Sequence, residues 1–235
     1  MKGLLVRVGA DQSDAGGNWN GPCDSTTRQF VYVPIHEDYP VRPGFQHLYD
    51  KIEPSLSQLS CQLPPQLKGK RMHLDPDFSY LTYGDQGQRA KQIKDKLGQG
   101  DLIVFYAGLQ DVRAPRLIYA IIGLYIIDTI VPAVTISETD WDSNAHTRRI
   151  LSRSADDIVV HGRAGMSGRL FEYVEIGEFR ERAYRVKPTL LKAWGGLSVK
   201  DGYLQRSARL PEFLSADSFY KWFLSCAPKL IETNN

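Results

Sequence analysis

Uninterrupted apolar runs mark the main strands of this sequence. Residues 3–8, 101–107 and 118–127 contain almost no polar position, a pattern typical of strands that are buried on both faces. The first run is therefore expected to lie centrally in a sheet. The other two, joined by a polar connection, predict a long antiparallel hairpin. Shorter strands are predicted at residues 30–35, 158–161, 171–174 and 184–186.

Helical spacing of apolar residues predicts two further elements. In residues 86–97, Ala90, Ile93 and Leu97 fall at i, i+3 and i+7, which places them on one face of an amphipathic helix. Residues 216–225 are rich in aromatic side chains and are expected to form a C-terminal helix that covers the sheet. Additional helices are predicted near residues 45–52 and over residues 141–152.

The order of these elements indicates the α+β class, with mixed α and β structure. No repeat, coiled coil or low-complexity linker divides the chain, so we expect a single domain over residues 1–235. The expected architecture is a mixed, partly antiparallel central sheet flanked by a few helices. A chain of 235 residues is long enough to bury a core without disulfide bonds.

Composition and hydropathy exclude secreted disulfide scaffolds and membrane-spanning proteins. Cys23, Cys61 and Cys226 are odd in number, far apart and without paired-ligand spacing, which also argues against a structural zinc site. The most apolar stretch, residues 117–136, is interrupted by a glycine, an aspartate and a proline and is too short to cross a membrane. The apolar run near the N-terminus is too short for the core of an export signal. We therefore expect a cytoplasmic protein without a membrane partner.

Charge is distributed unevenly along the chain. The total is +2, but residues 144–209 contain 13 Lys and Arg against 7 Asp and Glu. Ten of these 13 cations are arginine, whose side chain suits bidentate contacts with phosphate. Four glutamates are interleaved with them at positions 172, 175, 178 and 181. A solvated surface with local ion pairs is therefore the alternative to a phosphate-binding face.

A glycine-rich segment follows the first predicted strand. Residues 9–22 match neither G-x-G-x-x-G nor a P-loop, so these two nucleotide-binding motifs are not supported. Arg7 lies at the end of a buried strand and needs a partner, for which Asp11 is the nearest carboxylate. Trp19 stands between two asparagines, and stacking on a base is one hypothesis for it. The alternative for the whole segment is a turn capped by Asp and Asn side chains.

The sequence His73-Leu-Asp75-Pro-Asp77 places three chemically active side chains at alternate positions. In an extended segment these side chains lie on one side, which is the geometry of a metal half-site or of an acid/base cluster. The alternative is a turn at Pro76 that Asp75 and Asp77 cap.

A second histidine lies beside carboxylates near residue 142. If residues 141–152 are helical, Asp142 and His146 lie one turn apart on one face. The carboxylate would then orient the imidazole, or both groups would hold a metal ion. An ordinary pair near the N-terminus of a helix is the alternative.

Several blocks of sequence together resemble a known family. In order over residues 3–214, the chain contains LLVRVGADQS, WNGP, FVYVPI, HLDPDF, LTYGDQGQRAKQIKDKLGQGDLIVFYAGL, SNAHTRR and QRSARLPEFL. This set resembles the third family of nucleotide modification associated domains. The blocks point to Arg7, Asp11, Gly17, His73, Asp75, Asp77, Asp101, His146, Arg206 and Ser207.

The resemblance implies a DNA base hypermodification protein of phages and bacteria. Such a protein acts beside other DNA-modifying enzymes, on a base in DNA or on its nucleotide precursor. The resemblance brings no mechanism, so the reaction and any cofactor are left open. A DNA-binding reader and an accessory subunit of a modification complex are the alternatives to an enzyme.

The enzyme hypothesis assigns roles to these side chains. His73 or His146 would act as the general base, and Asp75 and Asp77 would orient it or, with His73, hold a divalent metal ion. Arg7 and Arg206 would bind phosphate, and Trp19 would stack on a base. Asp11 completes the proposed catalytic group, and the remaining substrate-binding candidates are Gly17, Asn20 and Ser207.

Overall fold

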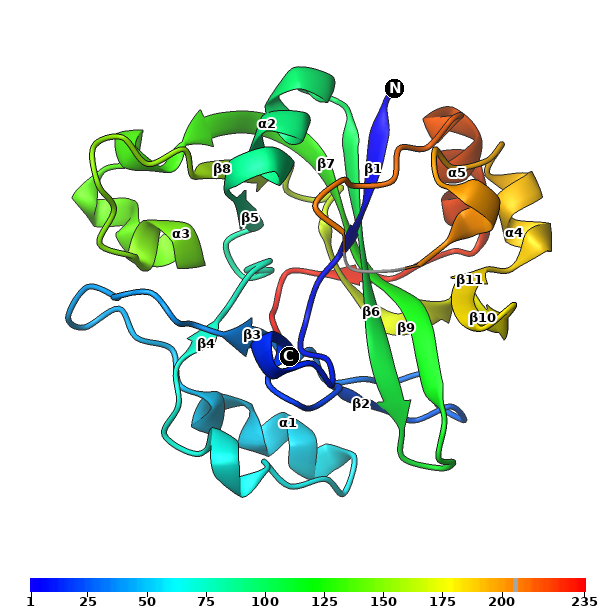
Figure 1. Ribbon diagram of the computed structural model, residues 1–235, viewed down its shortest axis with the longest axis horizontal. Coiled ribbons are helices and arrows are strands. Elements are labelled where there is room, and N and C mark those ends of the chain that lie inside the picture. Colours follow the sequence, from blue (N-terminus) through cyan, green and yellow to red (C-terminus); the bar gives the residue numbers. More distant parts are fainter. Residues whose placement is uncertain (205–206) are drawn as a thin grey trace.

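The hairpin predicted from the apolar runs lies at the centre of the sheet. The structure, a computed structural model, describes residues 1–204 and 207–235, and in these residues the central sheet is mixed and eight-stranded (Figure 1). Strands β6 (Leu102–Asp111) and β7 (Leu117–Pro132) pair antiparallel. A mixed sheet with few helices confirms the predicted α+β class.

Strand β7 is long enough to belong to two parts of the sheet. Its first half pairs with β6 and β9 (Gly168–Glu175), whereas its second half pairs with β8 (Ile158–Gly162). Strand β8 in turn pairs with β5 (Thr82–Asp85). The register of β7 against β8 shifts just after Ile127, and such irregularities bend a strand. The bend carries β5 away from β6 (Figure 1), to a place where β5 forms one wall of the site.

Strand β1 (Gly3–Arg7) lies at an edge of the sheet, so the prediction of a central position is wrong. Among the described strands it pairs with β6 alone, in parallel. Its burial has another cause, because residues 211–213 run along its other edge and the Leu5 N–H donates to the Pro211 carbonyl at 2.9 Å. A loop supplies the cover that a second strand was expected to supply.

Residues 30–35 do not form the predicted strand. The regular structure described there is β3 (Ile35–His36), which pairs with β4 (Met72–His73). Residues 30–34 are buried, but their backbone bonds to separate pieces of chain. The Val31 N–H, for example, donates to Pro22. An apolar run predicts that a segment is buried, but not what covers it; residues 30–34 are covered by loops and not by neighbouring strands.

The described residues contain five α-helices: α1 (Glu53–Gln58), α2 (Gly87–Lys96), α3 (Ala145–Arg148), α4 (Pro188–Ala193) and α5 (Ala216–Ser225). Helices α2 and α5 confirm the two predictions made from apolar spacing. The helix predicted near residues 45–52 is instead a 3₁₀ turn over residues 49–52 that leads into α1. In this part of the chain, no helix is long and apolar enough to span a membrane.

The single helix predicted over residues 141–152 is wrong. A 3₁₀ segment covers Glu138–Ser143, and the four-residue helix α3 follows it. Asn144 separates the two, because its backbone is extended (φ −153°) and its side chain caps α3. Asn side chains compete in this way with the backbone bonds of a continuous helix.

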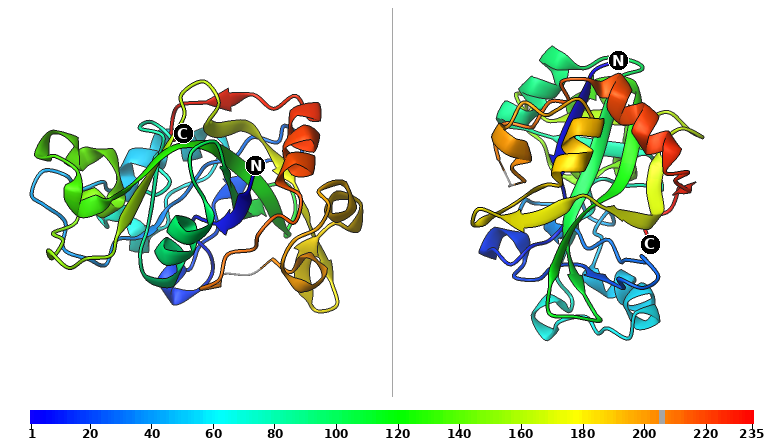
Figure 2. Two further views of the ribbon diagram at one scale, coloured as in Figure 1. Left: turned by 90° about the horizontal axis from the view of Figure 1, so that it is seen from above. Right: turned by 90° about the vertical axis from the view of Figure 1, so that its right-hand side faces the viewer.

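The remaining strands are short: β2 (Pro22–Cys23), β10 (Gly177–Arg180), β11 (Ala183–Val186) and β12 (Leu230–Ile231). Helices α4 and α5 lie together on the side of the sheet away from α3 (Figures 1 and 2). Trp194, at the end of α4, joins the two helices through edge and tilted ring contacts with Phe219 and Trp222 of α5, at 5.2 and 5.1 Å between centroids. This aromatic cluster leaves the opposite side, beside α2 and α3, for the site.

The close packing of the hairpin is testable at Gly123. A Cβ there would lie 2.5 Å from the Phe78 ring and 2.9 Å from the Gly168 carbonyl, so we expect Gly123→Ala to lower the free energy of unfolding by about 1–3 kcal/mol. Gly98→Ala is the matched control, because a Cβ at Gly98 meets nothing within 4 Å. Urea unfolding measures both variants. Equal midpoints for Gly123→Ala and the wild type would contradict the packing described.

Candidate functional site

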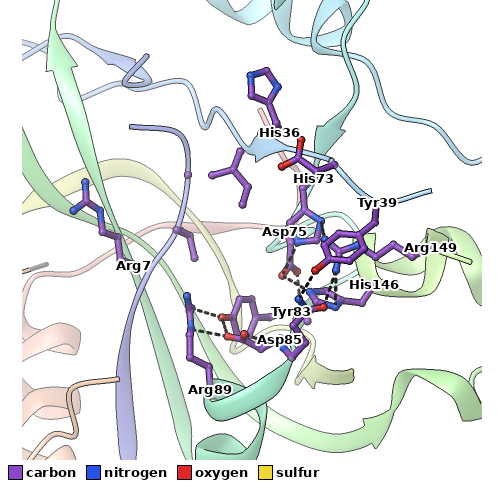
Figure 3. A pocket seen from close by; sticks show the side chains of 16 residues that line it. Arg7, His36, Tyr39, His73, Asp75, Tyr83, Asp85, Arg89, His146 and Arg149 are labelled. Carbon is purple, nitrogen blue, oxygen red and sulfur yellow. Dashed lines mark hydrogen bonds and ion pairs between the residues drawn. The ribbon is translucent and has the colours of Figure 1, made fainter. Parts of the chain in front are cut away.

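A cavity of about 230 Å³ opens beside the bent part of the sheet. Its walls come from the end of β1, the segment that follows β3, strands β4 and β5, and the starts of α2 and α3. Figure 3 shows His73, Asp75 and His146 close together at one side of it. Elements from six parts of the sequence therefore build this one site.

His73 is the ligand-like side chain that β4 contributes. Its Nδ1 lies 2.6 Å from Oε2 of Glu37, and its Nε2 lies 3.8 Å from Oδ2 of Asp75. Burial lowers the pKa of His73 to about 4, so the ring is neutral near pH 7. Glu37 accepts the Nδ1 proton, which leaves the Nε2 lone pair directed toward Asp75.

His146 enters the same cluster from the first turn of α3. Its Nδ1 lies 2.6 Å from Oδ1 of Asp157, and its Nε2 lies 3.9 Å from Oδ2 of Asp75. The two imidazole rings are 5.0 Å apart. His146 therefore repeats the arrangement of His73, with one ring nitrogen on a carboxylate and the other facing Asp75.

The predicted pair of Asp142 with His146 is wrong. Asp142 instead contacts His47 at 3.1 Å and Nε of Arg148 at 2.9 Å. The pairing required one continuous helix, and the break at Asn144 turns the two side chains in different directions.

Asp75 is the acceptor on which the cluster converges. Its Oδ1 accepts hydrogen bonds from the Gly84 N–H and the Asn144 amide, both at 2.8 Å. Its Oδ2 faces the two imidazoles. Burial raises the pKa of this carboxyl to about 7, because a charge is costly away from water unless an opposite charge lies nearby.

Gly84 makes room for this cluster. A Cβ at that position would lie 2.2 Å from Cδ2 of His146 and 2.6 Å from Oδ1 of Asn144. The residue therefore allows the imidazole to approach β5 closely, while its own N–H bonds to Asp75.

Glu37 is charged although it is buried. Burial by itself would raise the pKa of Glu37, but the hydrogen bonds from His73 and Arg149 and the positive charge of Arg149 lower it to about 2. Nε of Arg149 lies 3.1 Å from both Glu37 oxygens. The guanidinium also lies 4.1 Å from the ring centre of Tyr39, so Arg149 fixes one wall of the cavity.

The wall formed by β5 and α2 carries a second polar group. The Tyr83 hydroxyl donates to Asp85, and Nη2 of Arg89 donates to the Tyr83 oxygen at 2.7 Å. Nε of Arg89 lies 2.9 Å from Asp85. Figure 3 shows this group beside the cluster of His73, Asp75 and His146.

The cluster has the donors of a metal site. Nε2 of His73, Nε2 of His146 and Oδ2 of Asp75 offer one ligand atom each, and a set of ligand atoms from these residues lies within 4.8 Å. A transition metal takes such atoms at about 2.0–2.2 Å, so the three side chains would close in slightly around an ion. The carboxylates on both Nδ1 atoms are the outer partners usual for metal-bound histidines.

Asp77 does not belong to this cluster, so the prediction that His73, Asp75 and Asp77 share one side is wrong. The chain bends at Pro76, and Asp77 points away to Nη2 of Arg148 at 2.5 Å. Its other oxygen accepts from Asn234 at 2.8 Å. Asp77 lies in a buried ion pair away from the cavity.

The glycine-rich segment contributes to the site mainly through Arg7. The predicted pair of Arg7 with Asp11 is present, at 3.4 Å, and Arg7 lines the cavity. Gly17 lies behind the cavity-lining His36, because a Cβ added at Gly17 would lie 3.4 Å from Nε2 of His36. Asp11 itself is bound by Ser13 and does not line the cavity.

The other proposed substrate-binding residues lie elsewhere. Trp19 packs against the core, and the Asn20 amide donates to the Gly108 carbonyl at 2.8 Å. Ser207 lines a small neighbouring cavity, and Arg206 lies outside the described residues. Asp101 accepts from the Gly98 N–H in the turn before β6 and from the Lys2 N–H before β1, so it joins these two segments outside the cavity.

Five arginines in the described part of the arginine-rich segment are engaged with other groups of the protein. Arg148, Arg149 and Arg169 are buried, where they bond to carboxylates or carbonyls. Arg180 and Arg185 form ion pairs with acidic neighbours that include Asp201. Within the described part of the segment, much of the excess positive charge is used internally.

The partners of the two histidines could not be read from the sequence. Glu37 is 36 positions from His73, and Asp157 is 11 positions from His146, so no local spacing connects either pair. Asn144 did carry a signal, because an Asn directly before a helix is a common N-cap. Tyr83, Gly84, Asp85, Arg89 and Arg149 also line the cavity; they stand in the sequence blocks that resemble the family, but no local spacing assigns them to a site. Tyr39, a further lining residue, lies outside those blocks.

The buried pair of Asp77 with Arg148 is expected to stabilise the fold. Replacing Arg148 with Met leaves the Asp77 charge without its partner, so the free energy of unfolding should fall by about 3–5 kcal/mol. The double variant Arg148→Met/Asp77→Asn removes that charge and should recover part of the loss. Urea unfolding measures both variants, and wild-type stability of Arg148→Met would show that the pair is dispensable.

Comparison with known proteins supports the resemblance seen in the sequence blocks. A family model described as nucleotide modification associated domain 3 matches residues 2–215. No curated protein and no solved structure matches the chain. The match spans all of the elements that line the cavity.

Proposed function

Because the chain belongs to the nucleotide modification associated domain 3 family, we propose that it is a metal-dependent enzyme that modifies a DNA base or its nucleotide precursor. The ion would be held by His73, Asp75 and His146. The observation that carries this proposal is the convergence of two imidazole Nε2 atoms on one buried carboxylate oxygen, with a carboxylate behind each ring.

The electrostatics of the cluster favour a cation. Asp75, Glu37 and Asp157 place three carboxyl groups around two imidazoles that each offer a lone pair. Arg149 is the nearest cation to the Glu37 side of the cluster. A divalent ion between the Nε2 atoms would keep Asp75 ionised and would remove the cost of burying it.

The ligand set narrows the identity of the ion. Two imidazoles and one carboxylate suit Zn²⁺ or Fe²⁺ better than Mg²⁺ or Ca²⁺, which prefer oxygen ligands. Three protein ligands leave further coordination positions open, as in catalytic rather than structural sites. Those positions would face the cavity, where a bound base or water would meet the ion.

The cavity has the size and lining for one ring of a substrate. Its volume of about 230 Å³ is below the range of about 300–1,000 Å³ for drug-sized ligands. Tyr39 lines it with 48% of its surface exposed, and Arg149 holds one face of the ring. In this proposal Tyr39, rather than the core-packed Trp19, stacks on a base.

Metal binding provides the first test. His73→Ala, His146→Ala and Asp75→Asn each remove a proposed ligand atom. The affinity of these variants for Zn²⁺ or Fe²⁺ should therefore fall further than that of a variant in which only an outer partner is changed. Glu37→Gln changes such a partner and should weaken binding by about 10–100-fold. Isothermal titration of the metal-free protein measures these affinities.

His161→Ala is the matched control for the metal titration. His161 lies on β8, is half-buried and does not line the cavity, so its loss should leave the affinity unchanged. Equal affinities for His161→Ala and the three ligand variants would place the ion elsewhere.

The modification itself is tested by mass spectrometry of nucleosides from the DNA of the host or phage that carries this gene. We expect a modified nucleoside that is lost with Asp75→Asn and retained with His161→Ala. If deletion of the gene changes no nucleoside, the enzyme proposal fails. Salt-dependent binding of modified DNA without turnover would then favour a reader.

A further inference from the structure

We infer that Arg7 and Arg89 form a phosphate-binding subsite in the same cavity as the metal cluster. This inference rests on the proposed function and names the substrate class, a nucleotide bound through its phosphate. Figure 3 shows Arg7 and Arg89 on one side of the cavity and His73, Asp75 and His146 on the other. A phosphate at the arginines would leave the attached base free to extend toward the ion.

Arg7 is half-buried and has hydrogen-bond donors that no described residue uses. Its side chain is 10% exposed, and its contacts with described residues are an ion pair with Asp11 at 3.4 Å and the ring of Tyr119 at 5.2 Å. It donates no hydrogen bond that meets normal geometry to any residue in the described ranges. A guanidinium has five N–H donors, so most of those on Arg7 remain available to a ligand. A phosphate in the cavity would supply acceptors for several of them.

The Arg89 side chain is held by its neighbours, and its Nη1 group is still available to a ligand. Its Nη2 donates to the Tyr83 hydroxyl at 2.7 Å. Its Nε forms an ion pair with Asp85 at 2.9 Å but makes no hydrogen bond within the described residues. Its Nη1 has no bonded partner in residues 1–204 or 207–235. Because two neighbours fix the guanidinium, little conformational entropy is lost when Nη1 binds a ligand. Arg89 is therefore positioned to donate to an oxyanion.

The same two arginines also line a second, smaller cavity. It lies between β1, α2 and residues 207–211, and Ser207 and Arg209 complete its polar lining. Arg209 is exposed, and no carboxylate pairs with it in the described part of the chain. The two cavities meet at Arg7 and Arg89, so Arg209 adds positive charge at the outer side of the subsite.

Arginine side chains gather where the two cavities meet. Asp11 and Asp85 pair with Arg7 and Arg89, and the exposed Arg209 adds a positive charge at the outer cavity, whereas Asp38 lies elsewhere in the lining of the larger cavity. An ion bound at His73, Asp75 and His146 would add to the positive potential. Arginine matches the oxygen spacing of phosphate, so a phosphate group is the ligand that this chemistry selects.

Titration with inorganic phosphate and with deoxynucleoside 5′-monophosphates tests the subsite. Arg7→Met and Arg89→Met should each weaken binding by about 10–100-fold, as expected for loss of charge-assisted hydrogen bonds. Arg113→Ala is the matched control, because Arg113 lies beyond the end of β6 and pairs with Asp24. Arg7→Lys and Arg89→Lys keep the positive charge and replace the Met variants in the titration if a Met variant unfolds. Each Lys variant should bind phosphate more tightly than the corresponding Met variant.

Metal titration of the same variants separates this inference from the proposed function. Arg7→Met and Arg89→Met should bind Zn²⁺ or Fe²⁺ as the wild type does. Weaker phosphate binding with unchanged metal affinity supports the subsite. Unchanged phosphate binding in the double variant Arg7→Met/Arg89→Met overturns it, whatever the metal titration shows.

The source of the phosphate is distinguished by competition. A free nucleoside monophosphate and a single-stranded oligonucleotide without terminal phosphates are each used to displace inorganic phosphate. Displacement by the monophosphate alone identifies a nucleotide substrate, and equal displacement by the oligonucleotide identifies a backbone phosphate of DNA; both support the subsite. Displacement by neither compound overturns it.

Discussion

Two buried carboxylate–imidazole hydrogen bonds determine the geometry of this protein's site. Glu37 and Asp157 each hold Nδ1 of a histidine at 2.6 Å, and this fixes which nitrogen of each ring faces Asp75. Without either carboxylate the ring would be free to rotate or to change tautomer. The arrangement also concentrates negative charge in a buried place, where Arg149 compensates only part of it.

The bend in β7 is what allows these groups to meet. If β7 paired along its whole length with β6 and β9, β5 would have no strand beside it at the position it occupies. The switch to β8 creates that position, and β5 then presents Tyr83, Gly84 and Asp85 to the cavity. The arrangement of the sheet and the location of the site are therefore one feature.

Local sequence signals predicted those parts of the structure that depend on near neighbours. Apolar runs and helical spacing identified β6, β7, α2 and α5, because each buries a face that is visible in the order of its own residues. His73, Asp75 and His146 were selected because they carry reactive groups in short motifs. Glu37 and Asp157 were missed, since their roles arise from contacts that only the folded chain creates.

The wrong predictions also arise where contacts between distant parts of the chain, or a bend in it, override a local pattern. Alternation along the sequence groups Asp77 with His73 and Asp75 because it assumes a straight segment, and the bend at Pro76 removes that condition. Burial of β1 and of residues 30–34 was attributed to neighbouring strands, whereas loops cover them. Burial is encoded in a sequence more directly than the identity of the covering element.

The side chain of Asn144 connects the stability of one short helix to the binding of an ion. Its oxygen caps α3 through the His146 N–H, and its amide group bonds to Asp75. Local opening of α3 would therefore displace His146 and remove one of the two hydrogen bonds that hold Oδ1 of Asp75. An ion held at the proposed site would therefore stabilise this four-residue helix, because binding favours the conformation in which His146 and Asp75 face one another.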